Sequence, residues 1–220
     1  MSVWAILAAA GRGERLGLDR PKAFARLNDR PLLAESLERL DGSEWIEHIV
    51  VAAPPDWEEP CILVAEEVSA GKVAETVTGG ESRTESVRRA LADVPAEATV
   101  VLVHDAARPL VTEDVIERVV TALADGWDAA VPGLVVSDTV KRVDGESVIE
   151  TIERKGLVIA QTPQAFVADT LRRALDGGST ASDCAALVEA AGGRVRVVPG
   201  DARLVKVTEP ADLELVAGWL

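Results

Sequence analysis

Short apolar runs alternate with amphipathic stretches along most of the chain. The runs are continuous, which is typical of strands buried on both faces of a parallel sheet. The amphipathic stretches repeat apolar residues every three or four positions, which predicts helices with one buried face. Strands are predicted at residues 3–9, 48–53, 72–78, 99–103, 129–132, 195–198 and 204–207. Helices are predicted at residues 31–40, 57–68, 82–94, 113–124, 168–175 and 183–191, and from Pro210 onward.

This order of elements places the chain in the α/β class. It implies a mostly parallel sheet with helices on both faces, because parallel strands need a crossover connection between them. Ligands in such folds bind at the carboxyl ends of the strands. No internal repeat, low-complexity tract or linker interrupts the pattern, so residues 1–220 are expected to form a single domain.

Residues 136–154 depart from the α/β pattern. They alternate polar and β-branched residues around Asp144-Gly145, a dipeptide favoured in tight hairpin turns. The segment has too few large apolar residues to bury both of its faces. We interpret it as a protruding β-hairpin arm that a partner subunit completes. A solvent-exposed edge hairpin within one subunit is the alternative interpretation.

Composition excludes several classes of protein. Hydrophobic residues make up 48% of the 220 residues and charged residues 27%, which is ordinary for a globular protein and excludes a disordered chain. No apolar run approaches the roughly 20 residues of a membrane-spanning helix, so no membrane partner is expected. The first residues lack the features of a secretory signal. Cys61 and Cys184 form no disulfide framework or metal motif, so we expect both to be buried and the protein to be cytoplasmic.

The net charge of −14 results from 23 basic and 37 acidic residues. A chain this acidic repels a nucleic-acid backbone on average, so nucleic acid is not an expected partner. A small phosphorylated ligand remains compatible, provided that cations gather locally. Lys206 is informative here because it lies in a predicted apolar strand, where a cation without a partner would be costly.

The first candidate motif follows the first predicted strand. The sequence AAAGRGERL turns through Gly11 and Gly13, where backbone N–H groups can approach an anion, and Arg15 and Lys22 add two cations. The spacing fits neither the P-loop, since Lys22 is too far from the glycines, nor the dinucleotide fingerprint, since Leu16 replaces its third glycine. An ordinary strand–helix turn with surface cations is the alternative.

The second motif is VHDAARP, at the end of the strand predicted at residues 99–103. Asp105 follows a fully apolar run, which puts a carboxylate at the ligand-binding edge of the sheet. One carboxylate together with substrate phosphates suits Mg²⁺, and Arg108 is placed to meet a second anion. Asp105 could instead cap the next turn. His104 is expected to be buried and hydrogen bonded rather than a general base.

The third motif, GGESRTES, places two glycines before a helix start. Ser82 and Glu85 form a predicted capping box. Backbone donors and a serine hydroxyl then face one place, as at other anion-binding helix starts. Three polar side chains there could read a base or a ribose: Glu81, Arg83 and Ser86. A plain helix cap is the alternative.

Eight stretches, in this order along most of the chain, together resemble one enzyme family: AAAGRGERL, RPKAF, GGESRTESV, VHDAARP, SDTVKR, ERKGL, QTPQAF and KVTEPADL. They resemble the 2-C-methyl-D-erythritol 4-phosphate cytidylyltransferases of the non-mevalonate isoprenoid pathway. The resemblance implies a Rossmann-like nucleotidyltransferase fold, a homodimer with exchanged arms, and Mg²⁺ as cofactor. It implies transfer of CMP from CTP to methylerythritol phosphate, with release of pyrophosphate.

The resemblance also implies roles for individual residues. The implied catalytic residues are Arg15, Lys22, Arg154 and Lys206, and the implied metal ligand is Asp105. The implied CTP contacts are Ala8, Ala9, Ala10, Gly11, Gly80, Glu81, Ser86 and Ala106. The implied site for methylerythritol phosphate consists of Arg108, Thr139, Arg154 and Lys206, with Thr139 and Arg154 supplied by the partner's arm.

The chain departs from the family pattern at two positions. Leu204 stands where family members often have Asn, and Glu81 stands where Asp is common. Asp201 is the nearest acidic residue before Lys206, but its register is open and it is not included in the metal site. Three alternatives remain: a cytidylyltransferase for another sugar-alcohol phosphate such as ribitol 5-phosphate, a nucleotide sensor without catalysis, and an NAD-dependent oxidoreductase.

Overall fold

A central sheet organises the molecule in the computed structural model, which describes residues 1–220. Its strands are β1 (Val3–Ala8), β4 (His48–Ala53), β5 (Val73–Thr78), β6 (Val100–Asp105), β7 (Ala129–Val135), β10 (Val158–Ala160), β11 (Gln164–Val167) and β12 (Val195–Pro199). The order is β10-β7-β11-β6-β1-β4-β5, and β12 also pairs with β7. The pairs β1–β4, β1–β6, β4–β5 and β7–β12 are parallel. The predicted α/β class with a mostly parallel sheet is confirmed.

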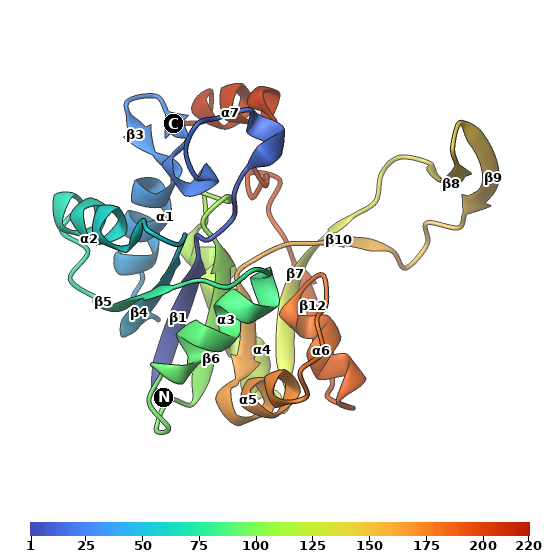
Figure 1. Cartoon of the computed structure of the whole chain (residues 1–220). Coiled ribbons are helices and arrows are strands. Elements are labelled where there is room, and N and C mark those ends of the chain that lie inside the picture. Colours follow the sequence, from blue (N-terminus) through green and yellow to red (C-terminus); the bar gives the residue numbers. More distant parts are fainter.

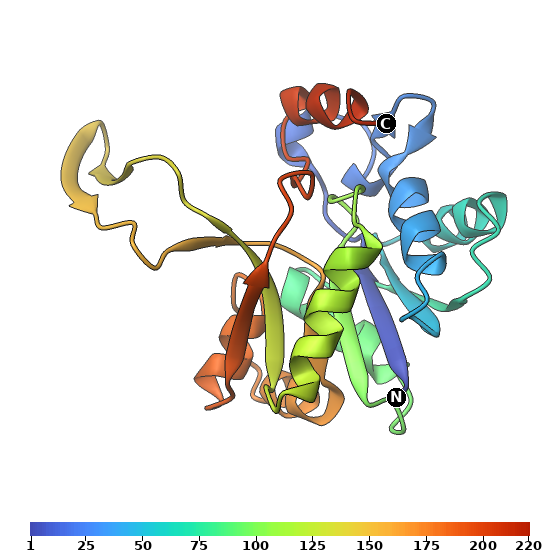
Figure 2. The ribbon, with the colours of Figure 1, turned by 180° about the vertical axis from the view of Figure 1, so that it is seen from behind.

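Helices cover both faces of the sheet (Figures 1 and 2). One face packs against α1 (Leu32–Asp41), α2 (Glu58–Glu67) and α4 (Glu113–Ala124). The other packs against α3 (Arg83–Ala92), α5 (Ala168–Asp176) and α6 (Cys184–Ala190). The last helix, α7 (Pro210–Ala217), lies with Leu16, Leu27 and Leu32 in a separate small cluster above the strand ends. Pro210 occupies the first helical turn, as predicted.

Strand β1 shows why the apolar runs are continuous. Ala5 and Leu7 belong to the core on the α1 face, whereas Trp4 and Ile6 belong to the core on the α3 face. Successive strand residues point to opposite faces, so a strand covered on both sides has to be apolar throughout. Burial of apolar surface on both faces provides the main stabilisation of the central sheet.

The strands differ from the sequence prediction in several places. Residues 204–207 form no strand, because their backbone groups bond elsewhere: Val207 N–H donates to Ala107 O at 2.8 Å, and Leu204 O accepts from the Arg108 side chain. Strands β10 and β11 were not predicted, although β10 pairs antiparallel with β7 and β11 runs antiparallel between β6 and β7. They have only three and four residues, so neither is marked by a long apolar run.

The start of α3 forms half of the predicted capping box. The Ser82 hydroxyl accepts from Glu85 N–H at 3.1 Å, as expected. The reciprocal bond is replaced, because the Glu85 carboxylate pairs with Arg88 and with Arg89 on the next turn. The helix start is therefore fixed by one side-chain cap, and the expectation of a full capping box is wrong.

The arm is a hairpin that extends away from the sheet (Figure 1). Strand β8 (Val140–Asp144) pairs with β9 (Ser147–Ile152) around the Asp144-Gly145 turn. Its apolar side chains Val143, Val148 and Ile149 are exposed. The hairpin thus buries neither of its faces within the chain.

Smaller elements complete the chain. They are the short strands β2 (Arg26–Leu27) and β3 (Arg30–Pro31) and two single turns of 3-10 helix at Glu14–Leu16 and Lys22–Phe24. Cys61 and Cys184 are free thiols and both are buried, as predicted. None of the helices combines the length and the apolar character needed to cross a membrane.

Candidate active site

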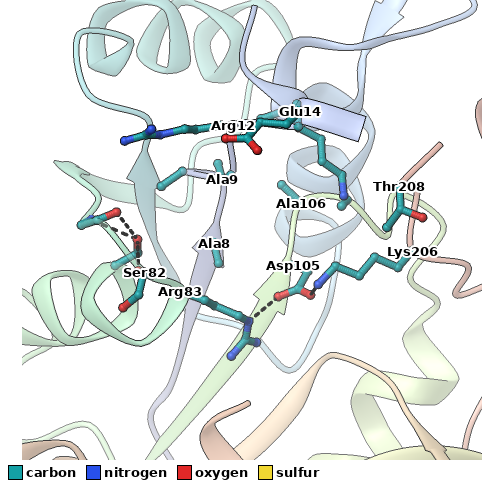
Figure 3. A pocket seen from close by; sticks show the side chains of 18 of the residues that line it. Ala8, Ala9, Arg12, Glu14, Ser82, Arg83, Asp105, Ala106, Lys206 and Thr208 are labelled. Atoms are coloured by element: carbon teal, nitrogen blue, oxygen red, sulfur yellow. Dashed lines mark hydrogen bonds and ion pairs between the residues drawn. The ribbon is translucent and has the colours of Figure 1, made fainter. Parts of the chain in front are cut away.

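A cavity of about 440 Å³ opens at the carboxyl ends of β1 and β6. Ala8 and Asp105 are neighbours in the register of these two strands, so the first two sequence motifs meet at the cavity floor. The third motif reaches the same cavity from the start of α3 (Figure 3). The predicted residues that line it are Ala8, Ala9, Ala10, Gly11, Arg15, Lys22, Gly80, Glu81, Ser86, Asp105, Ala106 and Lys206.

The glycine loop folds back onto Lys22. Lys22 N–H donates to Gly11 O at 3.2 Å, which closes the segment between the two residues. Gly13 has a φ of 72°, and a Cβ there would lie 2.7 Å from the Lys22 Cβ. Only glycine therefore suits this position. The loop brings Lys22 to the cavity although it is distant from the glycines in sequence.

The backbone of the loop is available to a ligand. Ala9 N–H donates to Ala52 O, but the N–H groups of Ala10, Gly11 and Arg12 donate to no group of the chain. Adjacent free N–H groups at the end of a strand form a concave donor surface for an anion. The anion cradle predicted from the sequence therefore has the donors it needs.

Asp105 lies between two cations. Its Oδ1 accepts from Arg83 Nε at 2.8 Å and its Oδ2 accepts from Lys206 Nζ at 2.7 Å, as Figure 3 shows. Burial alone would raise the pKa of Asp105, but Arg83 and Lys206 outweigh burial and hold this pKa well below its usual range. The carboxylate is therefore charged at neutral pH, and it does not cap the following turn.

Lys206 pairs with Asp105, but its segment is not a strand and its side chain is 41% exposed, so the expected burial of this cation in an apolar strand is wrong. The structure gives Arg83 a different role from the one predicted. It was a candidate to read a base or a ribose, but its guanidinium points to Asp105 and its Nη1 contacts Cys184 Sγ at 3.4 Å. Sequence alone could not have indicated this, because Arg83 and Asp105 are 22 residues apart on different elements.

Lys22 is a cation of the cavity whose pKa departs strongly from its usual value. Burial, with Lys206 and Arg15 nearby, lowers the pKa of Lys22 to about 8, although Asp105 acts in the opposite direction. A partly buried ammonium group beside other cations favours loss of its proton or binding of an anion. The cluster of cations in the cavity therefore favours binding of a phosphate group.

The turn between β5 and α3 is stabilised by Ser86. Its Oγ accepts from Gly80 N–H at 3.0 Å and donates to Ser82 O at 2.9 Å. Ser86 is buried, so its hydroxyl shapes the turn as well as lining the cavity. Glu81, at the rim, pairs with Arg12 of the glycine loop at 3.2 Å. Both of these side chains are at least three-quarters exposed, so the pair contributes little stability.

A family model for 2-C-methyl-D-erythritol 4-phosphate cytidylyltransferase (IspD) matches residues 3–220. The chain belongs to this family. The family protein of Saccharopolyspora erythraea is 44% identical, with the match covering 100% of both chains. That of Frankia casuarinae is also 44% identical, covering 99% of this chain and 81% of the relative. The family resemblance and the cytidylyltransferase class predicted from the eight motifs are confirmed.

Solved structures agree with the family assignment. The crystal structure of the enzyme from Thermus thermophilus is 34% identical and superimposes with a TM-score of 0.79, covering 100% of this chain and 98% of that one. A second structure, titled 4-diphosphocytidyl-2C-methyl-D-erythritol synthase, gives a TM-score of 0.84 at 29% identity, covering 98% of this chain and 97% of that one. The nucleotidyltransferase fold implied by the resemblance is thus confirmed.

Three residues that the family resemblance implied for the second substrate do not line the cavity. Arg108 donates to Leu204 O at 2.5 Å and to Ala160 O at 3.5 Å, so its guanidinium ties two segments together. Arg154 donates to Ser137 O within the arm. Thr139 is also on the arm, next to the start of β8. The cavity of one chain is therefore built without any residue of the arm.

Thr208 lines the cavity and was missed in the sequence. Its N–H and its hydroxyl both donate to the Asp212 carboxylate, at 2.7 and 2.8 Å, in the capping box of α7. The sequence KVTEPADL contains the signal, since a capping residue and Pro210 mark a helix start directly after Lys206. The residue that precedes the N-cap of α7 therefore lines the same cavity as Lys206.

A metal site made of protein ligands alone is not present, because no three His, Cys, Asp or Glu side chains gather around one point. The Asp105 carboxylate is anionic and lines the cavity. This donor fits Mg²⁺ bound mainly by substrate phosphates and water, which needs only one or two protein carboxylates. Asp201 does not line the cavity, and its carboxylate accepts from Arg203.

Proposed function

We propose that the chain transfers CMP from CTP to 2-C-methyl-D-erythritol 4-phosphate, giving 4-diphosphocytidyl-2-C-methyl-D-erythritol and pyrophosphate for isoprenoid precursor biosynthesis. The observation that supports this most is the charge arrangement of the cavity: one buried carboxylate, Asp105, among Arg83, Lys206 and Lys22, beside a loop of free N–H groups. Family membership supplies the substrate pair. We also propose a cytoplasmic location, supported by the two free thiols.

In the proposed reaction, a phosphate oxygen of methylerythritol phosphate attacks the α-phosphorus of CTP. A new P–O bond forms as the bond to the β-phosphate oxygen breaks, and pyrophosphate leaves on the opposite side. The attacking oxygen is already an anion, so no general base is required. The barrier comes from bringing two anions together, and positioning plus charge stabilisation lowers it.

Cations around the cavity supply that charge stabilisation. Lys22 and Arg15 lie beside the free N–H groups of the glycine loop, where the triphosphate of CTP would bind. Lys206 would compensate the charge of the second substrate's phosphate. The Asp105 carboxylate would hold Mg²⁺, which supplies further charge neutralisation on the phosphate oxygens when bound.

Small residues favour a pyrimidine nucleotide on the other side of the cavity. Ala8, Ala9, Ala10 and Gly11 leave room for a base to lie against the backbone, which can read its edge. Glu81 and the turn at Gly80 would contact the ribose or the base. We propose these residues, with Ser86 and Ala106, as the CTP site.

The second substrate needs residues that one chain does not bring to its own cavity. Thr139 and Arg154 lie on or beside the exposed arm, outside the cavity lining. The base of the arm also exposes apolar side chains: Val135 is 81% exposed and Ile159 56%. We propose a homodimer in which each arm covers the partner and supplies Thr139 and Arg154 to its cavity.

Pyrophosphate release from CTP tests the function. Purified protein is incubated with CTP and Mg²⁺, with either methylerythritol 4-phosphate or ribitol 5-phosphate as acceptor. We expect release with methylerythritol phosphate only. Release with ribitol phosphate alone would retain the nucleotide site and replace the acceptor. CTP binding without release for either acceptor would favour a nucleotide sensor.

A further inference from the structure

His104 is the one fully buried ionisable residue next to Asp105, and the proposed mechanism does not use it. It is 0% exposed and does not line the cavity. Both ring nitrogens nevertheless have partners: Nδ1 lies 3.1 Å from Thr162 Oγ1, and Nε2 lies 3.0 Å from Arg108 O. The same Thr162 oxygen accepts from Asp105 N–H at 3.1 Å.

The donor and the acceptor of each of these hydrogen bonds can be assigned. The Arg108 carbonyl can only accept, so His104 Nε2 carries the hydrogen. No carboxylate lies within hydrogen-bond distance of the ring, so its neutral form leaves Nδ1 as an acceptor. The Thr162 hydroxyl therefore donates to Nδ1, and a lone pair of the same oxygen is directed at Asp105 N–H. Each hydrogen bond of the relay Asp105–Thr162–His104–Arg108 therefore has one direction.

We propose that His104 and Thr162 are positioning residues that fix the Asp105–Arg108 turn and so direct the Asp105 carboxylate between Arg83 and Lys206. The inference rests on the proposed function. It assigns no proton transfer to His104. The substrates or the metal would meet Asp105, and the relay would act only through the placement of its backbone.

The surrounding bonds explain why this placement matters. The turn is closed by Arg108 N–H donating to Asp105 O at 2.9 Å. On its other side, Ala106 N–H donates to Ala8 O and the Ser36 hydroxyl donates to Ala106 O, each at 3.1 Å. Thr162 is the side chain that holds Asp105 N–H itself. Removing it leaves Asp105 N–H without its partner, while the glycine loop and the β5–α3 turn keep their own bonds.

Substituting Thr162 tests the relay with a matched pair. Thr162→Val keeps the shape and removes the hydroxyl, whereas Thr162→Ser keeps the hydroxyl. We expect Thr162→Val to lower kcat by roughly tenfold to a hundredfold. This is the usual effect of losing a hydrogen bond that orients a metal-ligating residue. The Kd for CTP, measured without metal, should change less than threefold, about 0.7 kcal/mol. Thr162→Ser should restore most of kcat.

Two measurements on the protein do not depend on turnover. In nitrogen NMR spectra of the imidazole, the His104 hydrogen should be on Nε2 in the unmodified protein. Hydrogen exchange of the Asp105 amide should be slow in the unmodified protein and in Thr162→Ser, and faster in Thr162→Val. These results would stand even if methylerythritol phosphate gave no turnover, so failure of the proposed function can be told apart from failure of the relay.

Three results would overturn the inference. A hydrogen on Nδ1 would mean that His104 donates to Thr162, opposite to the proposed direction. Unchanged kcat in folded Thr162→Val would show that the bond has no consequence for the reaction. A parallel loss of CTP binding, melting temperature and kcat that Thr162→Ser does not reverse would make Thr162 a general structural residue.

Discussion

At the scale of single residues, the two lysines of the cavity differ in their electrostatic surroundings. Of the five lysines, two are in the cavity, Lys22 and Lys206, and the charge of Lys206 helps to lower the pKa of Lys22. Lys206 is neutralised by Asp105, whereas Lys22 has no carboxylate within hydrogen-bond distance. Lys22 is therefore the cation that an incoming phosphate would stabilise most.

This difference predicts a pH dependence. The pKa of Lys22 is lowered to about 8, so Lys22 is charged below that pH and neutral above it. We expect kcat/KM for CTP to fall as pH rises through about 8, because that parameter reports the free enzyme. In kcat the fall should lie at higher pH, since bound phosphates favour the charged lysine.

Two variants identify the group. Lys22→Arg, which stays charged, should remove the alkaline fall from kcat/KM even if its rate is lower. Lys22→Met should be slow at every pH. An alkaline fall that persists unchanged in Lys22→Arg would assign it to another group.

At the scale of elements, two turns face one another on the side of the cavity that we propose binds CTP. The turn after β5 approaches the segment after β1 so closely that a Cβ on Gly79 would lie 2.4 Å from Ala10 Cβ and 2.9 Å from Ala53 O. Gly79 N–H also donates to Ala53 O at 2.8 Å. Glycine at this position sets the distance between the two turns.

Gly79→Ala should therefore push the turns apart and weaken nucleotide binding. We expect the Kd for CTP, measured by calorimetry, to rise at least tenfold, because displacements of about 1 Å in such sites have large effects. Gly71→Ala is the control, since no atom lies within 4 Å of a Cβ there. Equal CTP affinity in both variants would show that the close approach is not needed for binding.

At the scale of the whole molecule, the arm is an extension without a partner inside the chain. Its strands pair only with one another, and its apolar side chains Val143, Val148 and Ile149 are exposed. Exposed apolar side chains at a protruding hairpin are typical of an interaction surface. A symmetric dimer would bury two such arms in equivalent places.

Mixing inactive chains tests whether sites are shared. Lys22→Ala and Arg154→Ala chains are each expected to be inactive alone. After subunit exchange, each heterodimer should contain one site with both residues intact, so about a quarter of the original sites should return. Turnover per site is the measurement. Verified heterodimers without activity would show that each chain uses its own arm.

Local patterns were enough to predict the α/β alternation, the hairpin and three of the cavity's motifs, because hydrophobic periodicity, glycine turns and helix caps are short-range signals. The same patterns misassigned residues 204–207 and missed β10 and β11, since there the pairing partners are remote and the local signal is weak.

Which side chains meet in the cavity depends on the three-dimensional arrangement of the chain. Arg83 pairs with Asp105 across 22 positions, and Lys206 pairs with the same carboxylate across 101. Arg108 binds backbone carbonyls instead of lining the cavity. Ion pairs and hydrogen bonds of this kind depend on how strand ends and helix starts are brought together in space, and no periodicity along the chain encodes that distance.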